Sequence, residues 1–374
     1  MNTFKHFSNA GKTLPSKIKH QNEIARKTED ILIFRAIFLT LQFSFTFPIL
    51  SHSTQNITHF RHFLPLPIQF HPFPPFSTFL RFPCQLTTDI SAAGHIASSN
   101  FVDRYFQAPN INNEKEYLQF INELSDKHKI DYLFVSTDKE VRFLNRHKDE
   151  ITIPFDNCPS DTINIFQDKL EANRSIEKMG IKVPTIYDSL FGKDKVIFRK
   201  RCSVSSQGIY IVDLSKASHI ENHFHTDWFA QKYETGTTYV VDIFADKNGS
   251  PKLILPRKSL EKQMGSAFRS QIVKHDKLIQ ICKQIYSKYR IPGLSNVEFI
   301  ENDSGIYFIE INLRIGGSAS EGMIASFNYI EQYLDHFVNG ANLESLEYYM
   351  NCVAWDSIVS RYYDEVLFNA SLDS

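Results

Sequence analysis

Acidic residues are nearly missing from the first 88 residues of the chain. This stretch holds nine Lys or Arg against three Asp or Glu, and no acidic residue lies between Asp30 and Asp89. The whole chain of 374 residues holds 41 Lys or Arg against 42 Asp or Glu, so the part after residue 88 is net acidic. Soluble domains normally intersperse both charges, and the two parts therefore follow different compositional rules.

The sequence lacks the signature motifs of several functional classes. The five cysteines form no CxxC pair and no Cys/His ligand spacing, which argues against a disulfide framework and a structural zinc site. Neither a GxSxG elbow nor an HExxH pair occurs, which argues against a serine hydrolase and a zinc protease. A net charge of −1 argues against a nucleic-acid partner. We expect a cytoplasmic protein of two or three domains.

Residues 31–50 are apolar and just long enough to cross a bilayer, but Arg35, Gln42 and Pro48 interrupt them. Residues 51–83 are rich in Phe, Pro and His and show neither a helical nor a strand period. Three interpretations of this region stay open: a membrane anchor, a subdomain of unusual composition, and a segment without a stable native fold, such as a wrong-frame translation. We expect membrane contact only under the first interpretation.

From Asp89 onward the pattern predicts an α/β protein. Helical periods cover 114–127 and 276–289, and a third helix over 167–179 is expected to end at Gly180. Strand-like runs occupy 86–90, 131–136, 195–199, 208–213, 238–245, 253–256, 295–300 and 306–312. The alternation of strands and helices near residue 89 implies a parallel sheet there.

The strongest chemical pattern is the run 307–314, in which Glu310, Asn312 and Arg314 alternate with apolar residues and share one face of a strand. A turn-like stretch joins it to 296–300. If Ile300 pairs with Ile306, Glu298 lies opposite Phe308 and one diagonal step from Glu310. Two carboxylates at that separation suit Mg²⁺, and an arginine beside them suits phosphate.

This segment, with Gly316-Gly317 after it, resembles the metal-binding segment of the ATP-grasp superfamily, most of all carbamoyl-phosphate synthetase large chains and biotin carboxylase. The resemblance extends over roughly Asp89 to Ala341. It implies that Glu298, Glu310 and Asn312 hold Mg²⁺, with Mn²⁺ as an alternative ion. It also implies that Arg314 faces the γ-phosphate of ATP and the acyl-phosphate intermediate.

Other residues gain expected roles from the same resemblance. Lys169, at the start of the 167–179 helix, looks like the family's first phosphate-contacting lysine. The strand and flexible loop that close over the phosphates are represented by Arg199, Lys200, Ser205, Ser206 and Gly208, with Arg199 where relatives have lysine. The adenine-reading hinge is represented by Gln231, Lys232, Tyr233 and Glu234. Thr238 stands where relatives commonly hold ribose with Glu, and Arg257 resembles a phosphate- or substrate-facing catalytic arginine.

The expected fold class is α/β, an ATP-grasp fold of two subdomains preceded by a partial Rossmann-like domain. The expected boundaries are an atypical segment over 1–85, a partial pre-ATP-grasp domain over 86–155, subdomains over 156–230 and 231–345, and a C-terminal extension over 346–374. A first strand and its glycine-containing turn are not recognisable within residues 1–88.

The implied activity is an ATP- and Mg²⁺-dependent ligase that activates a small-molecule carboxylate as an acyl phosphate for attack by an amine. A variant within this class phosphorylates bicarbonate or carbamate. The alternative is a catalytically silent nucleotide-binding module or a disabled gene product. The sequence names neither the acid, the amine nor the oligomeric state.

Overall fold

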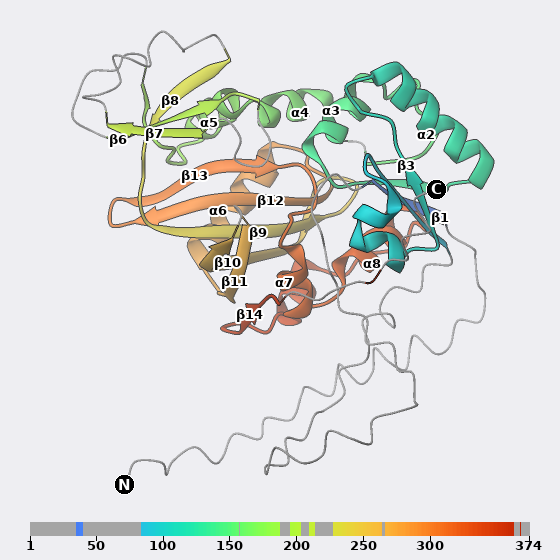
Figure 1. Cartoon of the computed structure of the whole chain (residues 1–374). Coiled ribbons are helices and arrows are strands. Elements are labelled where there is room, and N and C mark those ends of the chain that lie inside the picture. The colour runs from blue at the N-terminus through green and yellow to red at the C-terminus, as the bar shows by residue number, and fades with distance from the viewer. Residues whose placement is uncertain are drawn as a thin grey trace, which may run out of the picture.

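The computed structural model describes residues 35–39, 84–156, 158–187, 195–202, 209–213, 227–263, 266–362 and 367. Three sheets organise these residues, and helices α5, α4 and α3 run in a row from the small sheet toward the N-terminal unit (Figure 1). Three residues with predicted roles in the phosphate loop lie outside the described part of the chain: Ser205, Ser206 and Gly208. Most of residues 1–83 also lie outside it.

The first sheet is parallel and has the strand order β3-β2-β1-β4. Its strands are β1 (Arg35–Leu39), β2 (Cys84–Asp89), β3 (Arg104–Gln107) and β4 (Tyr132–Val135). Two short 3-10 helices, η2 (Ala93–His95) and η3 (Ala97–Phe101), follow β2. The helices α2 (Glu114–His128) and α3 (Asp138–Arg146) accompany this sheet, and its core includes Leu86, Ile121, Leu133 and Phe143.

Strand β1 corrects the expectation that no first strand lies within residues 1–88. Residues Arg35–Leu39 pair in parallel with β2 on one side and with β4 on the other. They lie inside the apolar stretch 31–50, so these five residues favour a subdomain of unusual composition over a membrane anchor. Within the part of the chain that the structure describes, no helix has both the length and the apolar character needed to cross a membrane.

The second sheet is antiparallel, with the strand order β5-β8-β6-β7. Its strands are β5 (Ile186–Tyr187), β6 (Lys195–Lys200), β7 (Ile209–Asp213) and β8 (Trp228–Lys232). It is preceded by α4 (Ser160–Gln167) and α5 (Lys169–Glu177). The helix expected over 167–179 is α5, which begins at Lys169 because the Asp168 side chain accepts hydrogen bonds from the amides of Leu170 and Glu171 and caps it. Helix α4, which precedes it, was not predicted.

The third and largest sheet is antiparallel, with the strand order β13-β12-β9-β10-β11-β14. Its strands are β9 (Thr237–Ala245), β10 (Pro251–Gln263), β11 (Ser266–Ile272), β12 (Gly293–Asn302), β13 (Gly305–Asn312) and β14 (Ile358–Ser360). Strand β14 belongs to the segment expected to be a C-terminal extension. It pairs with β11 and so forms part of the sheet.

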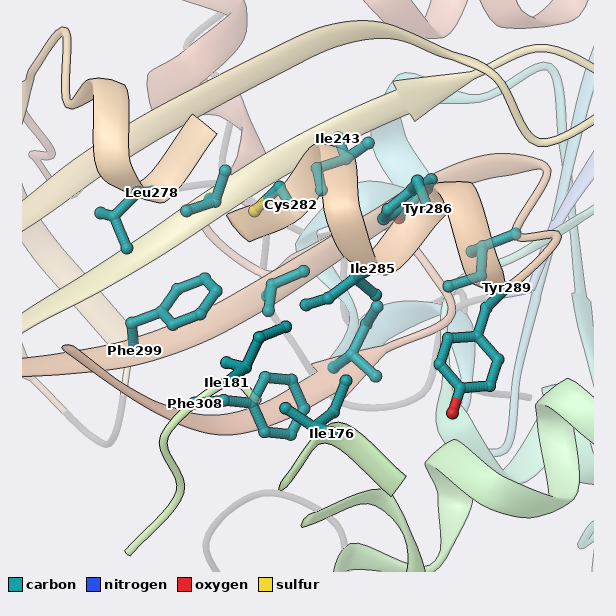
Figure 2. Close-up of a cluster of buried hydrophobic side chains, with 14 of the residues drawn as sticks. Ile176, Ile181, Ile243, Leu278, Cys282, Ile285, Tyr286, Tyr289, Phe299 and Phe308 are labelled. Carbon is teal, nitrogen blue, oxygen red and sulfur yellow. The ribbon is translucent and has the colours of Figure 1, made fainter. Parts of the chain in front are cut away.

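Helix α6 (Asp276–Lys288) packs against one face of the large sheet. Figure 2 shows Leu278, Cys282 and Ile285 of this helix above Phe299 of β12 and Phe308 of β13. The opposite face is covered at one end by α7 (Ala319–Ile324) and α8 (Tyr329–Phe337), through a cluster that includes Phe244, Tyr329 and Tyr333. A last helix, α9 (Leu346–Asn351), precedes β14. Four aromatic residues lie in or against this cluster: Phe327, Tyr329, Tyr333 and Phe337.

Candidate functional site

A β-bulge in β13 brings the two predicted metal-binding carboxylates together. The register between β12 and β13 is regular from the turn to the pair of Phe299 with Phe308. The next pair is Glu298 with Glu310, so Ile309 is an extra residue in β13. The bulge lets Phe308 enter the core on the α6 side while Glu310 projects from the other face. The expected register, with Ile300 opposite Ile306 and Glu298 opposite Phe308, is therefore wrong: Ile300 pairs with Tyr307 and Glu298 faces Glu310 directly.

Two like charges directly opposite each other on neighbouring strands are destabilising. Burial and the adjacent charge of Glu310 raise the pKa of Glu298 above its ordinary value. Burial also opposes the ionisation of Glu310, but the charges of Lys169 and Arg199 outweigh it and hold the pKa of Glu310 below its ordinary value. The pair therefore concentrates negative charge that one added cation would relieve.

The two cationic residues at Glu310 come from different elements. Arg199 Nη2 of β6 donates to Glu310 Oε2 at 2.6 Å, and Lys169 Nζ of α5 lies 3.4 Å from the same oxygen. All three side chains are largely buried, with 6% of Arg199, 14% of Lys169 and 20% of Glu310 exposed. Arg199 Nε is buried and has no hydrogen-bond partner among the described residues. An anionic ligand could supply that partner.

Asn312 lies beside the carboxylate pair and is oriented by a residue that the sequence reasoning missed. Asn312 Nδ2 donates to Asn296 Oδ1 at 3.0 Å, and Asn296 Nδ2 donates to the carbonyl of Arg314 at 3.4 Å. The Asn312 Oδ1 atom can then act as an acceptor toward a cation. Asn296 precedes Glu298 by two residues on the same strand face, and this alternation was the signal that could have found it.

The donor set fits Mg²⁺ together with a phosphorylated ligand. In the described part of the chain, no three His, Cys, Asp or Glu side chains gather closely enough to hold a metal ion. Two carboxylates and one amide oxygen are nevertheless the hard oxygen ligands that Mg²⁺ prefers, and Mg²⁺ commonly takes its remaining ligands from water and substrate phosphates. The fit therefore depends on a ligand that brings phosphate oxygens.

Arg314 lies two residues beyond the end of β13 and contacts α3 of the N-terminal domain, the part of the chain built on the parallel sheet. Its Nε and Nη2 atoms donate to Asp138 Oδ2 at 3.3 and 3.0 Å, and its Nη1 donates to the carbonyl of Ile315 at 2.9 Å. The charge of Arg314 also lowers the pKa of Glu298 and Glu310, so the guanidinium lies within electrostatic range of both. Asp138 was not among the site residues predicted from the sequence.

Lys200 does not join this group. Successive residues of a strand point to opposite faces, and since Arg199 reaches Glu310, Lys200 points the other way. Its Nζ lies 5.4 Å from the ring centroid of Trp228, the residue opposite it on β8. The structure thus separates two residues that the sequence offered as joint phosphate ligands and brings only Arg199 to the carboxylate pair.

The predicted hinge begins at the end of β8 and uses its polar side chains internally. Gln231 is buried and donates to Asn173 Oδ1 at 3.0 Å, while Glu234 Oε1 lies 3.2 Å from Lys232 Nζ. The amide of Tyr233 donates to the carbonyl of Lys195. Thr238, opposite Ile300 on β12, shares its sheet face with Glu298. The adenine and ribose roles of these residues stay predictions.

Arg257 is not placed as expected. It is fully buried on β10, where Nε and Nη2 donate to the two oxygens of Asp242 at 2.7 and 3.0 Å. Its Nη1 donates to Glu321 Oε2 at 2.6 Å, and Nη2 also donates to Ser318 Oγ at 2.9 Å. A guanidinium bonded in this way is enclosed by protein and does not face a ligand, so the structure gives Arg257 a structural position. The sequence carried no signal for its acidic partners.

A cavity of about 40 Å³ lies between the N-terminal domain and the large sheet, lined by Phe134, Asp156, Cys158, Leu294 and Arg314 among others. It is much smaller than a ligand pocket, which typically has about 300–1,000 Å³. The cavity therefore holds no nucleotide, and the carboxylate pair rather than this cavity marks the candidate site.

Comparison with known proteins agrees with this geometry. A family model described as an ATP-grasp domain matches residues 166–318, which include Lys169, Arg199, both carboxylates and Arg314. Residues 166–318 match an ATP-grasp domain. The resemblance deduced from the sequence is thereby confirmed, as is the mixed α/β fold with its parallel N-terminal sheet. A comparison with curated proteins found no match.

Solved structures with the same fold include ligases and carboxylases. Biotin carboxylase from Campylobacter jejuni is 17% identical, with 71% of this chain and 67% of that chain covered and a TM-score of 0.56. L-amino acid ligase from Bacillus licheniformis is 14% identical, with 68% of each chain covered and a TM-score of 0.54. N5-carboxyaminoimidazole synthetase from Staphylococcus aureus, solved with ADP, is 15% identical, with 70% and 72% covered and a TM-score of 0.54. At these identities the likeness establishes the fold alone.

Proposed function

We propose that the protein is an ATP- and Mg²⁺-dependent ligase that activates a carboxylate as an acyl phosphate, which an amine then attacks. The direct pairing of Glu298 with Glu310, with Lys169 and Arg199 at Glu310, carries the proposal. Burying two carboxylates and two cationic side chains together costs free energy unless a bound ligand interacts with them.

In this proposal Glu298, Glu310 and Asn312 hold Mg²⁺, which would neutralise the negative charge of the ATP phosphates. Lys169 and Arg199 exchange part of their contact with Glu310 for phosphate oxygens, and the unpartnered Nε of Arg199 gains an acceptor. Arg314 contacts the γ-phosphoryl group as it moves to the carboxylate. No protein nucleophile is required, because positioning and charge stabilisation suffice for this class of transfer.

The base would lie between the two sheets, next to the hinge. Ile197 precedes Arg199 by two residues and shares its face of β6, and Ile300 follows Glu298 by two residues on β12. Both isoleucines are partly buried. Their placement supports an adenine position between them, with the polar edge of the base toward residues 232–234.

Calorimetry on the full chain tests the proposal. We expect ATP to bind with Mg²⁺ and to bind much more weakly without it, and Glu298→Gln to remove most of this dependence. Glu301→Gln is the matched control, because Glu301 lies on the same strand but contacts His275 on the α6 side. Absence of nucleotide binding in the wild-type protein would refute the proposal.

A second measurement separates a ligase from a silent nucleotide-binding module. Release of ADP, followed with panels of carboxylates and amines and with bicarbonate, is expected to exceed the rate with ATP alone for at least one combination. Tight Mg²⁺-dependent binding without stimulated ADP release would instead favour the silent module. The bicarbonate reaction distinguishes the variant that phosphorylates bicarbonate or carbamate.

A further inference from the structure

The contact between Arg314 and Asp138 joins the candidate phosphate site to the N-terminal domain across 176 residues of sequence. Both side chains are mostly buried, with 17% of Arg314 and 20% of Asp138 exposed. An ion pair at this depth is screened less than a surface pair. The bonds to Asp138 therefore help to fix the orientation of the Arg314 guanidinium.

The three bonds of Arg314 use particular edges of its guanidinium. Nε and the adjoining hydrogen of Nη2 donate to one oxygen, Asp138 Oδ2, and one hydrogen of Nη1 goes to the Ile315 carbonyl. Of the five N–H donors of arginine, two remain, one on Nη1 and one on Nη2. Among the described residues neither has a partner. Nη1 and Nη2 form the end of the guanidinium, here called the terminal fork, and their remaining hydrogens can donate to phosphate oxygens.

Asp138 is itself held rigidly. It is the first residue of α3, and the preceding Thr137 forms a capping box with Glu140. Glu140 is buried, accepts from the Thr137 amide at 3.1 Å, and accepts from the hydroxyl of Tyr117 on α2 at 3.3 Å. These bonds fix the position of the backbone that carries the Asp138 side chain.

The topology places this residue where ligands gather in open parallel sheets. In the order β3-β2-β1-β4 the chain moves from β1 toward β3 and then returns to add β4 on the other side of β1. The switch point is thus between β1 and β4, and ligands of such sheets bind outside the carboxyl ends of the strands there. Asp138 follows the carboxyl end of β4.

We propose that Asp138 is a positioning residue, which fixes the side edge of the Arg314 guanidinium so that its terminal fork faces the transferring phosphoryl group. The proposal rests on the function proposed above, because it takes Arg314 to contact the γ-phosphoryl group. Asp138 itself touches no substrate. The N-terminal domain thereby contributes to the phosphate site through one carboxylate, and an arginine free to rotate would bind the γ-phosphoryl group less well.

The test compares two nucleotides on the full chain by calorimetry: Mg²⁺ with the non-hydrolysable analogue adenylyl-imidodiphosphate, and Mg²⁺ with ADP. Asp138→Ala is expected to weaken binding of the analogue by about five- to tenfold, the loss that follows from one misplaced charge-assisted hydrogen bond. ADP lacks the γ-phosphoryl group, and its affinity is expected to change less than about twofold. Asp138→Asn is expected to restore most of the analogue affinity, since one side-chain oxygen accepts both bonds in the wild-type protein.

Two further variants make the result specific. Arg314→Gln is expected to weaken the analogue by itself, and adding Asp138→Ala to it is expected to have no further effect. Glu114→Ala is the matched control, because Glu114 is also an acidic residue in the first turn of a helix of this domain but pairs with Arg146. It is expected to bind both nucleotides as the wild-type protein does.

Equal weakening of both nucleotides by Asp138→Ala, or no weakening of either, would overturn the positioning role. So would a further loss when Asp138→Ala is added to Arg314→Gln. These outcomes presuppose that the wild-type protein binds Mg²⁺ with the analogue. If the wild-type protein binds neither nucleotide, the proposed function fails, and the positioning role is overturned with it.

Discussion

The carboxylates of Glu298 and Glu310 face each other on hydrogen-bonded strands because one residue, Ile309, is extra in β13. The ion pairs of Lys169 and Arg199 both go to Glu310 Oε2. The two acids therefore differ: the pKa of Glu310 lies below its ordinary value, and burial together with Glu310 raises the pKa of Glu298. In the absence of a metal ion, the charged form of Glu298 is therefore less favourable than that of Glu310.

Glu298→Gln is expected to stabilise the metal-free protein. The substitution keeps the size and hydrogen-bonding capacity of the side chain but removes a like charge opposite Glu310, and we expect the free energy of unfolding to rise by about 0.5–1 kcal/mol. Urea unfolding at pH 7 with a chelator present measures this. Glu301→Gln is not expected to be stabilised, because the charge it removes faces His275 and not another carboxylate. A destabilised Glu298→Gln would show that the wild-type pair is not repulsive.

The alternation of β6 separates the effects of Arg199 and Lys200. Arg199→Ala is expected to weaken Mg²⁺-dependent ATP binding by about tenfold or more, because it removes a charged phosphate partner. Lys200→Ala is expected to leave that affinity unchanged and to lower the free energy of unfolding by about 0.5–1 kcal/mol, through loss of the contact with Trp228. Calorimetry and urea unfolding measure the two quantities. A loss of ATP affinity in Lys200→Ala would contradict the assignment of faces.

The sequence identified the residue types of the candidate site better than its geometry. The alternation of Glu310 and Asn312, and the position of Glu298 on the preceding strand, were enough to predict a shared face. The register was wrong for two reasons: the turn pairs Asn302 with Gly305, which moves the partner of Ile300 from Ile306 to Tyr307, and nothing in the type of Ile309 marks it as the extra residue of a bulge. A bulge inverts the faces beyond it, so the pairing of two acids could be found only from the paired strands.

The partners of the arginines could not be predicted because they depend on contacts distant in sequence. Asp138 lies 176 residues from Arg314, and Glu321 lies 64 residues from Arg257. An arginine in a strand looks the same in sequence whether it meets a ligand or a buried acid. Strand β1 was missed for a different reason: its apolar residues lie in a region whose low charge resembles a membrane span or a non-native segment.

Glu140 is expected to make the stability of the protein depend on pH. Burial raises its pKa to about 8, whereas an unfolded glutamate titrates near 4.3, so the folded state binds more protons between these values. The free energy of unfolding therefore falls as pH rises from 5 to 8, with a contribution from this group of up to about 1.4 kcal/mol per pH unit.

Glu140→Gln tests this dependence, because Gln offers an oxygen to the Thr137 amide and cannot ionise. The difference in free energy of unfolding between the variant and the wild-type protein is expected to shift in favour of the variant as pH rises from 5 to 8. Urea unfolding across that range measures it. Glu123→Gln, at an exposed position on α2, is the control. Its free energy of unfolding is expected to depend on pH in the same way as that of the wild-type protein. A parallel curve for Glu140→Gln would show that Glu140 does not titrate in this range.

Arg257 provides the clearest separation of a structural role from a ligand-facing one. Arg257→Met removes the charge that two buried acids, Asp242 and Glu321, both contact. Breaking a buried ion pair from one side leaves an uncompensated charge and costs about 3–5 kcal/mol. We expect this loss in urea unfolding with no nucleotide present, since the partners of Arg257 belong to the protein. Arg257→Lys is expected to recover only part of it, because a single ammonium cannot reproduce the fork on Asp242 together with the bond to Glu321.

Arg269→Ala is the matched control for this prediction. Arg269 lies on the neighbouring strand β11 and pairs with Glu261, but 49% of Arg269 and 40% of Glu261 is exposed. Exposed pairs contribute little, so we expect a change within about 0.5 kcal/mol. If Arg257→Met were as stable as this control while ATP-dependent activity fell, the enclosed network would contribute little to stability, and the substrate-facing role expected from the sequence would be restored. Loss of stability without nucleotide instead assigns Arg257 to the framework that holds the loop after Arg314, through its bond to Ser318.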